Sequence, residues 1–366
     1  MNIDFDLRRP EERSMLELRR LYELYGYRKY KVSNFEEYSL YLQYKKFLSG
    51  DKILSFTDLD GRLLALRPDV TLSIIKNAPD DETTKAYYIE TVYRESAESN
   101  TFKEIKQMGL EFLGKVDAYA VAEVVSLAQQ SLAVCGREYI LELGHMGFVC
   151  GLLDKLELAS PERQRIVEAV SAKSPHLLAQ AAEELNMGAA DKKRLLALLD
   201  FSGSPEKVLP MAEEICSGRR MQAAIDELKA LCEALADNKH IHLDLSLLNA
   251  TEFYDGVLMR GYLPGLPRPV LSGGRYDSMM SKLGRRAAAI GFAVYLDELE
   301  RLPIPPKEYD VDVWLSPAKG ENVAGVLEAV KKIVSGGESV RVADELPEDL
   351  RAKRHLRLAE GELMEC

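Results

Sequence analysis

The sequence predicts an α+β protein: an antiparallel sheet flanked by helices, with a helical insertion and a small α/β unit at its C-terminal end. Strand-like runs separated by polar turns fill residues 1–146 and return at 240–302, which we interpret as two parts of one core. Between them, residues 147–239 are rich in Leu, Ala, Glu and Lys, which favour helices. The segment PIPP at 303–306 marks a linker, because consecutive prolines cannot continue a helix, and the small unit follows at 309–366.

The first part of the core begins with a helix over residues 11–25, because apolar positions recur there at helical spacing and Gly26 can end it. Polar turns such as the one at 58–61 separate the following strands, so we expect antiparallel pairing. A helix of alanines, valines and leucines is expected at 117–134. The expected strands are KILSFTD, RLLALRPD, AYYIETVYRES, KEIKQMGLEFLG and, after that helix, YILELGH.

Strand patterns return after the insertion. Residues 289–302 read as a strand that turns into a helix. The other expected strands of the second core part are HIHLDLSLL, EFYDGVLMRGYL and RPVLSGGRYD. In the C-terminal unit, strand and helix patterns alternate in the order VDVWLSP, NVAGVLEAVKKIV, SVRVAD, LPEDLRAKR and HLRLAEGELME.

Composition narrows the possible environments and partners. The chain has 366 residues, of which 46% are hydrophobic and 29% charged, a balance typical of globular proteins. No run approaches the roughly 20 apolar residues that span a bilayer, and the N-terminus lacks the apolar core of a signal peptide, so we expect a cytoplasmic protein without a membrane partner. The net charge of -11 weighs against a nucleic-acid partner.

Common motifs for nucleotide, cofactor or metal chemistry are missing from the sequence: there is no GxxxxGK[ST], no GxGxxG after a strand, no HExxH and no GxSxG. His240 and His242 are spaced to face one side of a strand, but no acidic or cysteine ligand accompanies them. We therefore expect no cofactor and no metal site. The five cysteines are odd in number and form no CxxC pair, which favours reduced thiols.

Five separated motifs occur in the order and spacing of histidyl-tRNA synthetase, which the chain resembles over about residues 1–302. The resemblance implies a class II aminoacyl-tRNA synthetase-like sheet that holds histidine and ATP. The motifs are LRPDVT at 66–71, VYRES at 92–96, KQMGLEFLG at 106–114, SGGRYD at 272–277 and AIGFAVYLDEL at 289–299.

The resemblance implies a set of amino-acid-binding residues. Asp69 and Thr71 match the acidic residue and the threonine that bind the amino group of histidine, and a carboxylate and a hydroxyl suit an ammonium. Arg94 matches the arginine that grips the α-phosphate and the carboxylate. The same residues also have structural interpretations, such as Asp69 as a cap or an ion pair between Arg94 and Glu111. The remaining candidates are Gln107, Glu111, Phe253, Tyr254, Gly273 and Arg275, the last of which could instead pin a turn with Asp277.

Other positions depart from the synthetase pattern where ATP would bind. Asn249 stands where the synthetase has an arginine, and an uncharged amide cannot balance the charge that develops during adenylation. Glu298 replaces the arginine that would lie against ATP, and Tyr295 replaces a glycine. The loop that meets ATP and tRNA in the synthetase carries Glu95, Glu98 and Glu104 here, which suits phosphates poorly.

The chain therefore resembles more closely the synthetase-like regulatory subunit of ATP phosphoribosyltransferase, in which LELGHMG has a counterpart. That resemblance implies a non-catalytic subunit, needed for the activity of a short-form catalytic subunit and for feedback inhibition by histidine in the first step of histidine biosynthesis. It also implies a hetero-octamer with the catalytic subunit. We expect at least a homodimer through the synthetase-like core, at its first helix and strand, because an exposed sheet edge and the apolar face of residues 15–25 need cover. Ser33 replaces a proline of the synthetase dimer interface, which bears on the packing of that dimer.

Two other functions stay open from the sequence. One is an amino-acid-activating ligase, such as a divergent histidyl-tRNA synthetase, against which Asn249 and Glu298 argue. The other is a free-standing amino-acid sensor with a different partner. The ligase could also activate another amino acid. We expect the pocket to accept histidine or a similar amino acid, and the sequence leaves open whether histidine binds in the synthetase-like pocket or at a subunit interface.

Overall fold

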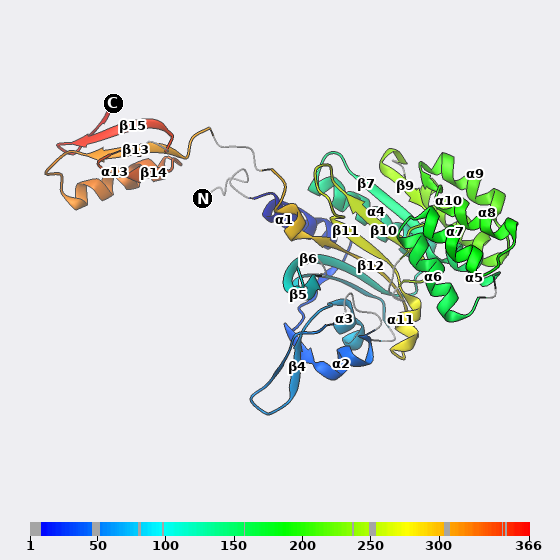
Figure 1. The fold of residues 1–366 in the computed structure, drawn as a ribbon. Helices are drawn as coiled ribbons and strands as arrows, with labels where there is room; N and C mark the ends of the chain where they lie inside the picture. The colour runs from blue at the N-terminus through cyan, green and yellow to red at the C-terminus, as the bar shows by residue number, and fades with distance from the viewer. Residues whose placement is uncertain are drawn as a thin grey trace. The chain divides into compact units, whose positions relative to one another are not determined.

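A nine-stranded sheet organises the first of two units, Met1–Leu302 (Figure 1). Its strand order is β1-β5-β6-β12-β11-β10-β7-β9-β8. Neighbouring strands are antiparallel except for the pairs β1 with β5 and β7 with β9, which confirms the α+β class. The strands are β1 Arg28–Lys29, β5 Thr84–Ser96, β6 Thr101–Gly114, β7 Ile140–His145, β8 Ser202–Gly203, β9 Ile241–Asp244, β10 Val257–Tyr262, β11 Leu271–Arg275 and β12 Ala288–Tyr295.

The computed structural model describes most of the chain, and every structural statement below concerns the described residues. These are residues 9–45, 52–79, 82–96, 99–156, 158–235, 238–248, 254–303, 308–345, 347 and 350–366. Asn249, Phe253 and Glu98, all singled out from the sequence, lie outside them.

Two long helices cover one face of the sheet. α1 (Pro10–Leu24) and α4 (Ala118–Cys135) pack on each other, and α4 also packs on β10 and β12. The hydroxyls of Tyr22 on α1 and Ser131 on α4 lie 2.9 Å apart in this buried contact. By length and composition α4 could cross a membrane, but half of it is buried inside the unit, as is typical of a core helix.

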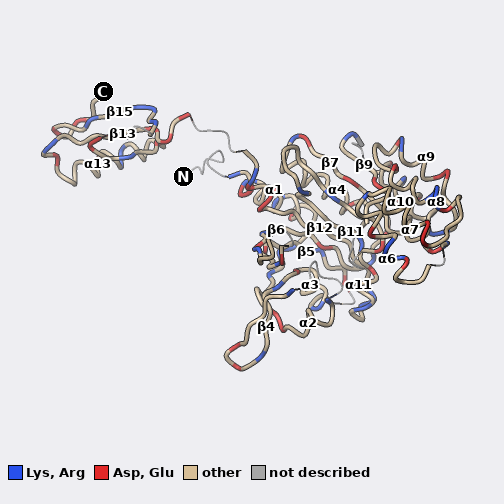
Figure 2. The backbone as a smooth tube through the Cα atoms, viewed as in Figure 1, with Lys and Arg blue, Asp and Glu red and all other residues tan. Residues whose placement is uncertain are grey.

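The segment between β7 and β9 is mostly helical and extends the same core. Buried leucines of these helices join the cluster that includes the sheet residues Leu141 and Leu243. Figure 2 shows positions of Lys and Arg interspersed with those of Asp and Glu along these helices. The helices are α5 Met146–Asp154, α6 Ser160–Ser171, α7 Pro175–Glu184, α8 Ala189–Leu198, α9 Pro205–Ile215 and α10 Arg219–Ala234, followed by a 3-10 turn at Asn238–His240.

A three-stranded sheet, β2 (Phe35–Glu37), β4 (Leu63–Leu66) and β3 (Ser55–Thr57), forms a smaller layer with its own core. The fully buried Arg67, just after β4, ties this layer to the main sheet. Its guanidinium donates to the carbonyls of residues 32, 33 and 91 and forms a 2.7 Å ion pair with Glu90. The short helices beside this layer are α2 Tyr38–Gln43, α3 Thr71–Asn77 and α11 Asp277–Lys282, and α12 Leu296–Leu299 follows β12.

The second unit, Pro303–Cys366, has a four-stranded sheet of order β14-β13-β15-β16 and one helix. The helix predicted for LPEDLRAKR is wrong, because Ala352 and the residues after it belong to β15 and pair parallel to β13. Alternate residues Leu356 and Leu358 enter the small core, which a strand satisfies. The elements are β13 Val311–Pro317, α13 Val323–Ser335, β14 Val340–Val342, β15 Ala352–Ala359 and β16 Glu362–Glu365.

Candidate functional site

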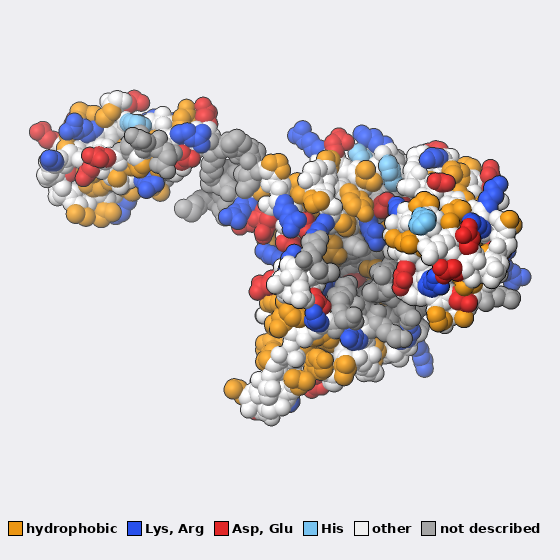
Figure 3. All heavy atoms as spheres, viewed as in Figure 1, with side chains coloured by type: hydrophobic (Ala, Val, Ile, Leu, Met, Phe, Trp, Pro, Cys, Tyr) orange, Lys and Arg blue, Asp and Glu red, His pale blue; other side chains and the backbone are white. Residues whose placement is uncertain are grey.

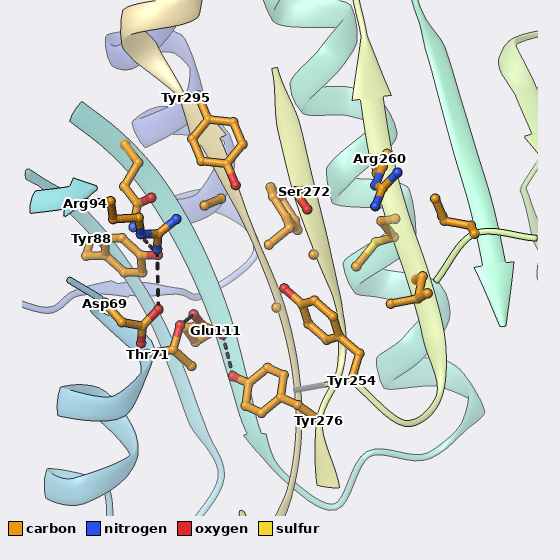
Figure 4. A pocket seen from close by; sticks show the side chains of 18 of the residues that line it. Asp69, Thr71, Tyr88, Arg94, Glu111, Tyr254, Arg260, Ser272, Tyr276 and Tyr295 are labelled. Atoms are coloured by element: carbon orange, nitrogen blue, oxygen red, sulfur yellow. Dashed lines mark hydrogen bonds and ion pairs between the residues drawn. The ribbon is translucent and has the colours of Figure 1, made fainter. Parts of the chain in front are cut away.

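A cavity of about 140 Å³ lies on the main sheet, on the face opposite the helix-covered core (Figure 4). Because side chains alternate between the faces of a strand, Phe292 packs into the core while Gly291 and Ala293 lie under the cavity. Gly109 pairs with Ala293 across the neighbouring strand and, like it, has no bulky side chain on this face of the sheet. A Cβ at Gly291 would overlap the Glu111 carboxylate, so only glycine leaves room for that side chain.

The walls of the cavity come from five strands of the sheet, from the start of α3 and from the segments after β9, before β10 and after β11. Polar and aromatic groups dominate them. The lining residues are Asp69, Thr71, Tyr88, Arg94, Gln107, Glu111, Leu247, Leu248, Tyr254, Leu258, Met259, Arg260, Ser272, Gly273, Tyr276, Gly291, Phe292, Ala293 and Tyr295.

Glu111 is the most deeply placed charge-bearing group of the cavity, with 3% of its surface exposed. The Thr71 hydroxyl donates to one carboxylate oxygen at 2.7 Å, and the Tyr276 hydroxyl donates to the other at 2.5 Å. Burial raises the pKa of Glu111 to about 8, although these two hydrogen bonds oppose the shift. The group is therefore poised to ionise when a cation or an N–H donor enters the cavity.

Asp69 serves both as a helix cap and as a cavity residue. One carboxylate oxygen accepts the backbone N–H of Leu72 at 2.9 Å, and the other lies 3.6 Å from the guanidinium of Arg94. Arg94 also donates to the Pro68 carbonyl at 2.7 Å. The structure thus pairs Arg94 with Asp69, and the ion pair with Glu111 considered from the sequence does not form. Burial raises the pKa of Asp69, and Arg94 limits that rise.

Gln107 supplies a buried amide whose hydrogen bonding is incomplete. Its Nε2 donates to the Tyr88 hydroxyl at 3.2 Å, while its Oε1 is buried and has no hydrogen-bond partner among the described residues. Tyr88 can lie across the sheet because Gly109 has no side chain in its way. Since buried polar groups are nearly always satisfied, the amide oxygen indicates a donor supplied by a ligand or by water.

Aromatic rings close the cavity on the side of β10 and β11. Tyr254 and Tyr276 meet edge to face with their ring centres 6.4 Å apart.

Gly273 contributes to the lining, but Arg275 does not. Along β11, Arg275 falls on the face opposite Ser272, and its guanidinium pairs with Asp277 at 2.8 Å. Arg275 therefore stabilises the turn with Asp277, which was its structural interpretation, and we exclude it from the cavity.

A second cavity, of about 210 Å³, adjoins the first, and Arg94 and Tyr295 line both. Its lining includes Tyr295 and Glu298, two of the positions where the sequence departs from the synthetase pattern. Glu298 is 3.0 Å from the guanidinium of Arg301 and 3.9 Å from that of Arg268. The acid is thus held by two arginines, and the Tyr295 side chain occupies space that a glycine would leave open.

Sequence reasoning missed several lining residues, chiefly Tyr88, Arg260, Ser272 and Tyr276. A signal for the first three was available, because cross-strand register places them in one row of alternate residues. The row runs from Tyr88 through Gly109, Ala293 and Ser272 to Arg260. Finding it requires the strand order, which local sequence patterns do not supply.

Comparisons with known proteins agree with this architecture. The family model described as histidyl-tRNA synthetase matches residues 7–299. The chain is 30% identical over 341 residues to an ATP phosphoribosyltransferase regulatory subunit of Desulforamulus reducens, covering 88% of this chain and 83% of that protein.

Solved structures show the same fold. A structure described as an ATP phosphoribosyltransferase regulatory subunit/histidyl-tRNA synthetase from Bacillus halodurans has a TM-score of 0.76 at 25% identity and covers 94% of each chain. A chain of the ATP phosphoribosyl transferase (HisG:HisZ) complex from Thermotoga maritima has a TM-score of 0.62 at 18% identity and covers 78% of this chain and 97% of its own. With its class II synthetase-like fold and its sequence identity over most of its length, the chain belongs to the family of ATP phosphoribosyltransferase regulatory subunits.

Proposed function

We propose that this chain is a non-catalytic, cytoplasmic subunit that a short-form ATP phosphoribosyltransferase catalytic subunit needs for activity, and that it confers feedback inhibition by histidine. The contrast between the two adjoining cavities carries the proposal. The first keeps a connected set of amino-acid-binding groups around Glu111. In the second, the acid Glu298 stands at the position that the synthetase resemblance gives to an ATP-contacting arginine, and it engages two of the basic lining residues, Arg268 and Arg301.

The first cavity is the proposed histidine site. Its buried carboxylates favour an ammonium or a protonated ring, and the free Oε1 of Gln107 accepts one more N–H. Tyr254 and Tyr276 offer apolar ring surface to an imidazole. The proposed amino-acid-binding residues are Asp69, Thr71, Arg94, Gln107, Glu111, Tyr254 and Gly273, together with Phe253, which lies outside the described residues.

Assembly is the second part of the proposal. The Thermotoga maritima chain that shares this fold comes from a HisG:HisZ complex. We propose that this chain forms a hetero-octamer with its catalytic subunit, built on homodimers of this chain. Hydrophobic side chains gather on the three-stranded sheet (Figure 3), where Phe35, Phe56 and Leu63 are 48%, 40% and 49% exposed. Exposed apolar groups of this kind favour burial between two copies.

The decisive experiment is co-purification with a short-form catalytic subunit. ATP phosphoribosyltransferase activity is then measured for the catalytic subunit alone, for the mixture, and for the mixture with histidine. We expect little activity alone, full activity in the mixture, and inhibition by histidine only in the mixture. A catalytic subunit that is equally active and equally inhibited without this chain would refute the proposal.

A further inference from the structure

Arg260 lines the proposed histidine cavity from β10, and the proposed function gives it no role. In the sheet it lies opposite Ser272 of β11 on one side and opposite Glu142 of β7 on the other. Ser272 in turn pairs with Ala293 of the cavity floor. Figure 4 shows Arg260 and Ser272 on the side of the cavity away from Asp69 and Arg94.

The charges of the cavity are separated along this row. Arg94 lies beside Asp69 at one end, so their charges largely balance each other. Glu111, at the same end, is held by hydroxyl groups only. Arg260 is the remaining cation among the described residues of the lining and stands at the other end. The cavity thus presents an acidic group at one end and a basic group at the other, which complements a zwitterion.

Arg260 keeps donors for a ligand. Its Nη2 donates a 3.3 Å hydrogen bond to the Leu248 carbonyl, and its side chain also bonds the Tyr262 hydroxyl. A guanidinium has five N–H donors, so these contacts leave several unused. Among the described residues no carboxylate lies within 4.0 Å of it; Glu142, its cross-strand neighbour, also feels the charge of Lys173. The arginine is therefore oriented by its neighbours without being neutralised by an ion pair.

The span of the cavity fits a small amino acid. β6, which carries Glu111, and β10, which carries Arg260, are separated by β12 and β11. Three strand spacings correspond to about 14 Å between backbones. Both side chains line the cavity between these strands. The Ser272 hydroxyl lies between them and adds a donor near the arginine.

We propose that Arg260 and Ser272 form the subsite that holds the carboxylate of the ligand, so that the cavity selects a free amino acid over the corresponding amine. The inference rests on the proposed function, since it names what the histidine cavity recognises. It gives the cavity a carboxylate contact that does not depend on Arg94, which Asp69 already engages. An arginine with free donors is the side chain best suited to a carboxylate.

Calorimetry with histidine and histamine tests this subsite on the full-length chain. Histamine keeps the ring and the ammonium of histidine but lacks the carboxylate. We expect the wild type to bind histidine at least tenfold more tightly than histamine, roughly the effect of one charge-assisted hydrogen bond. Arg260→Gln should weaken histidine about tenfold or more and leave histamine within about twofold, which removes the discrimination. Arg260→Lys should restore part of it.

Arg357→Gln, at an exposed arginine of the second unit, is the matched control and should change neither affinity. Equal losses for histidine and histamine in Arg260→Gln would overturn the subsite, as would an unchanged ratio of the two affinities. If the wild type binds histidine and only the ratio fails to respond, the subsite is refuted while the histidine site stands. If the wild type binds neither compound, both are refuted.

Discussion

The Tyr276 hydroxyl donates a 2.5 Å hydrogen bond to the carboxylate of Glu111, 165 positions away in the sequence. The bond joins the segment after β11 to the C-terminal part of β6 and fixes the carboxylate over Gly291. It also makes the ionisation of Glu111 a property of the assembled core, because the carboxyl is buried only when these strands have come together.

Glu111 should make stability depend on pH. Its pKa rises from an ordinary value of 4.5 to about 8 on folding. The folded protein therefore keeps a proton that the unfolded chain releases, and the contribution of Glu111 to stability is full below pH 4.5 and is lost as the pH rises to 8. In that window the loss is on the order of 1.4 kcal/mol per pH unit. Urea unfolding of the wild type and of Glu111→Gln is measured across these pH values. The free energy of unfolding should fall more steeply with pH for the wild type. An equal slope for the two proteins would contradict this prediction.

Removing the acids of the cavity should weaken histidine binding. Asp69→Ala and Glu111→Ala each delete a carboxylate that would face a cationic or N–H-donating group of the ligand. Calorimetry should show losses of roughly 2 to 5 kcal/mol, as for truncation of a buried charged partner. Arg275→Gln is the control, because that side chain lies on the other face of the sheet and should leave the affinity unchanged. Equal affinity in all three variants would place the histidine site elsewhere.

The isolated chain should not form histidyl adenylate. By the synthetase resemblance, Glu298 and Asn249 stand where two arginines would balance phosphate charge. In the structure, Glu298 pairs with Arg301. Histidine-dependent exchange of pyrophosphate into ATP should stay at background, with a histidyl-tRNA synthetase as positive control. A clear exchange signal would instead support an amino-acid-activating ligase.

Homodimerisation should depend on the three-stranded sheet. Phe35 and Phe56 meet edge to face at 5.7 Å on its exposed surface. A charge at Phe56 would be buried in the proposed dimer, so Phe56→Asp should give monomers at micromolar concentration in sedimentation velocity. Leu177→Asp, at an exposed leucine of α7, is the control and should remain dimeric. A dimer that survives Phe56→Asp would place the interface on another surface.

Substitution of Arg67 should destabilise the fold more than substitution of any other charged residue of the core. Arg67→Met would leave Glu90 without its cation and three carbonyls without a donor. We expect a loss of about 3 to 5 kcal/mol in the free energy of unfolding, measured with urea. Arg67→Lys, which keeps the charge but lacks the planar set of donors, should fall between Met and the wild type. A loss below about 1 kcal/mol would show that the hydrogen bonds and the ion pair of Arg67 contribute little to the free energy of unfolding.

The sequence predicted the sheet class because period-2 patterns and polar turns are local signals. It also brought Asp69, Thr71 and Glu111 into one site through the synthetase resemblance. Arg275 was misplaced because membership of a motif does not say which face of a strand a residue occupies. Arg260 was missed because its place in the cavity depends on the register of strands far apart in the chain. Tertiary pairing also determined the secondary structure of the C-terminal segment, where residues of helix-like composition form a strand beside β13.

Neighbouring residues of β12 belong to the core on one face of the sheet and to the cavity on the other. Phe292 fills the helix-covered core, whereas Ala293 beside it forms the floor of the cavity. Substitutions at Phe292 should therefore act mainly on the packing of the core, and substitutions at Ala293 mainly on the shape of the cavity. The cavity can thus change shape through every second residue of a few strands while the helix-covered core stays as it is.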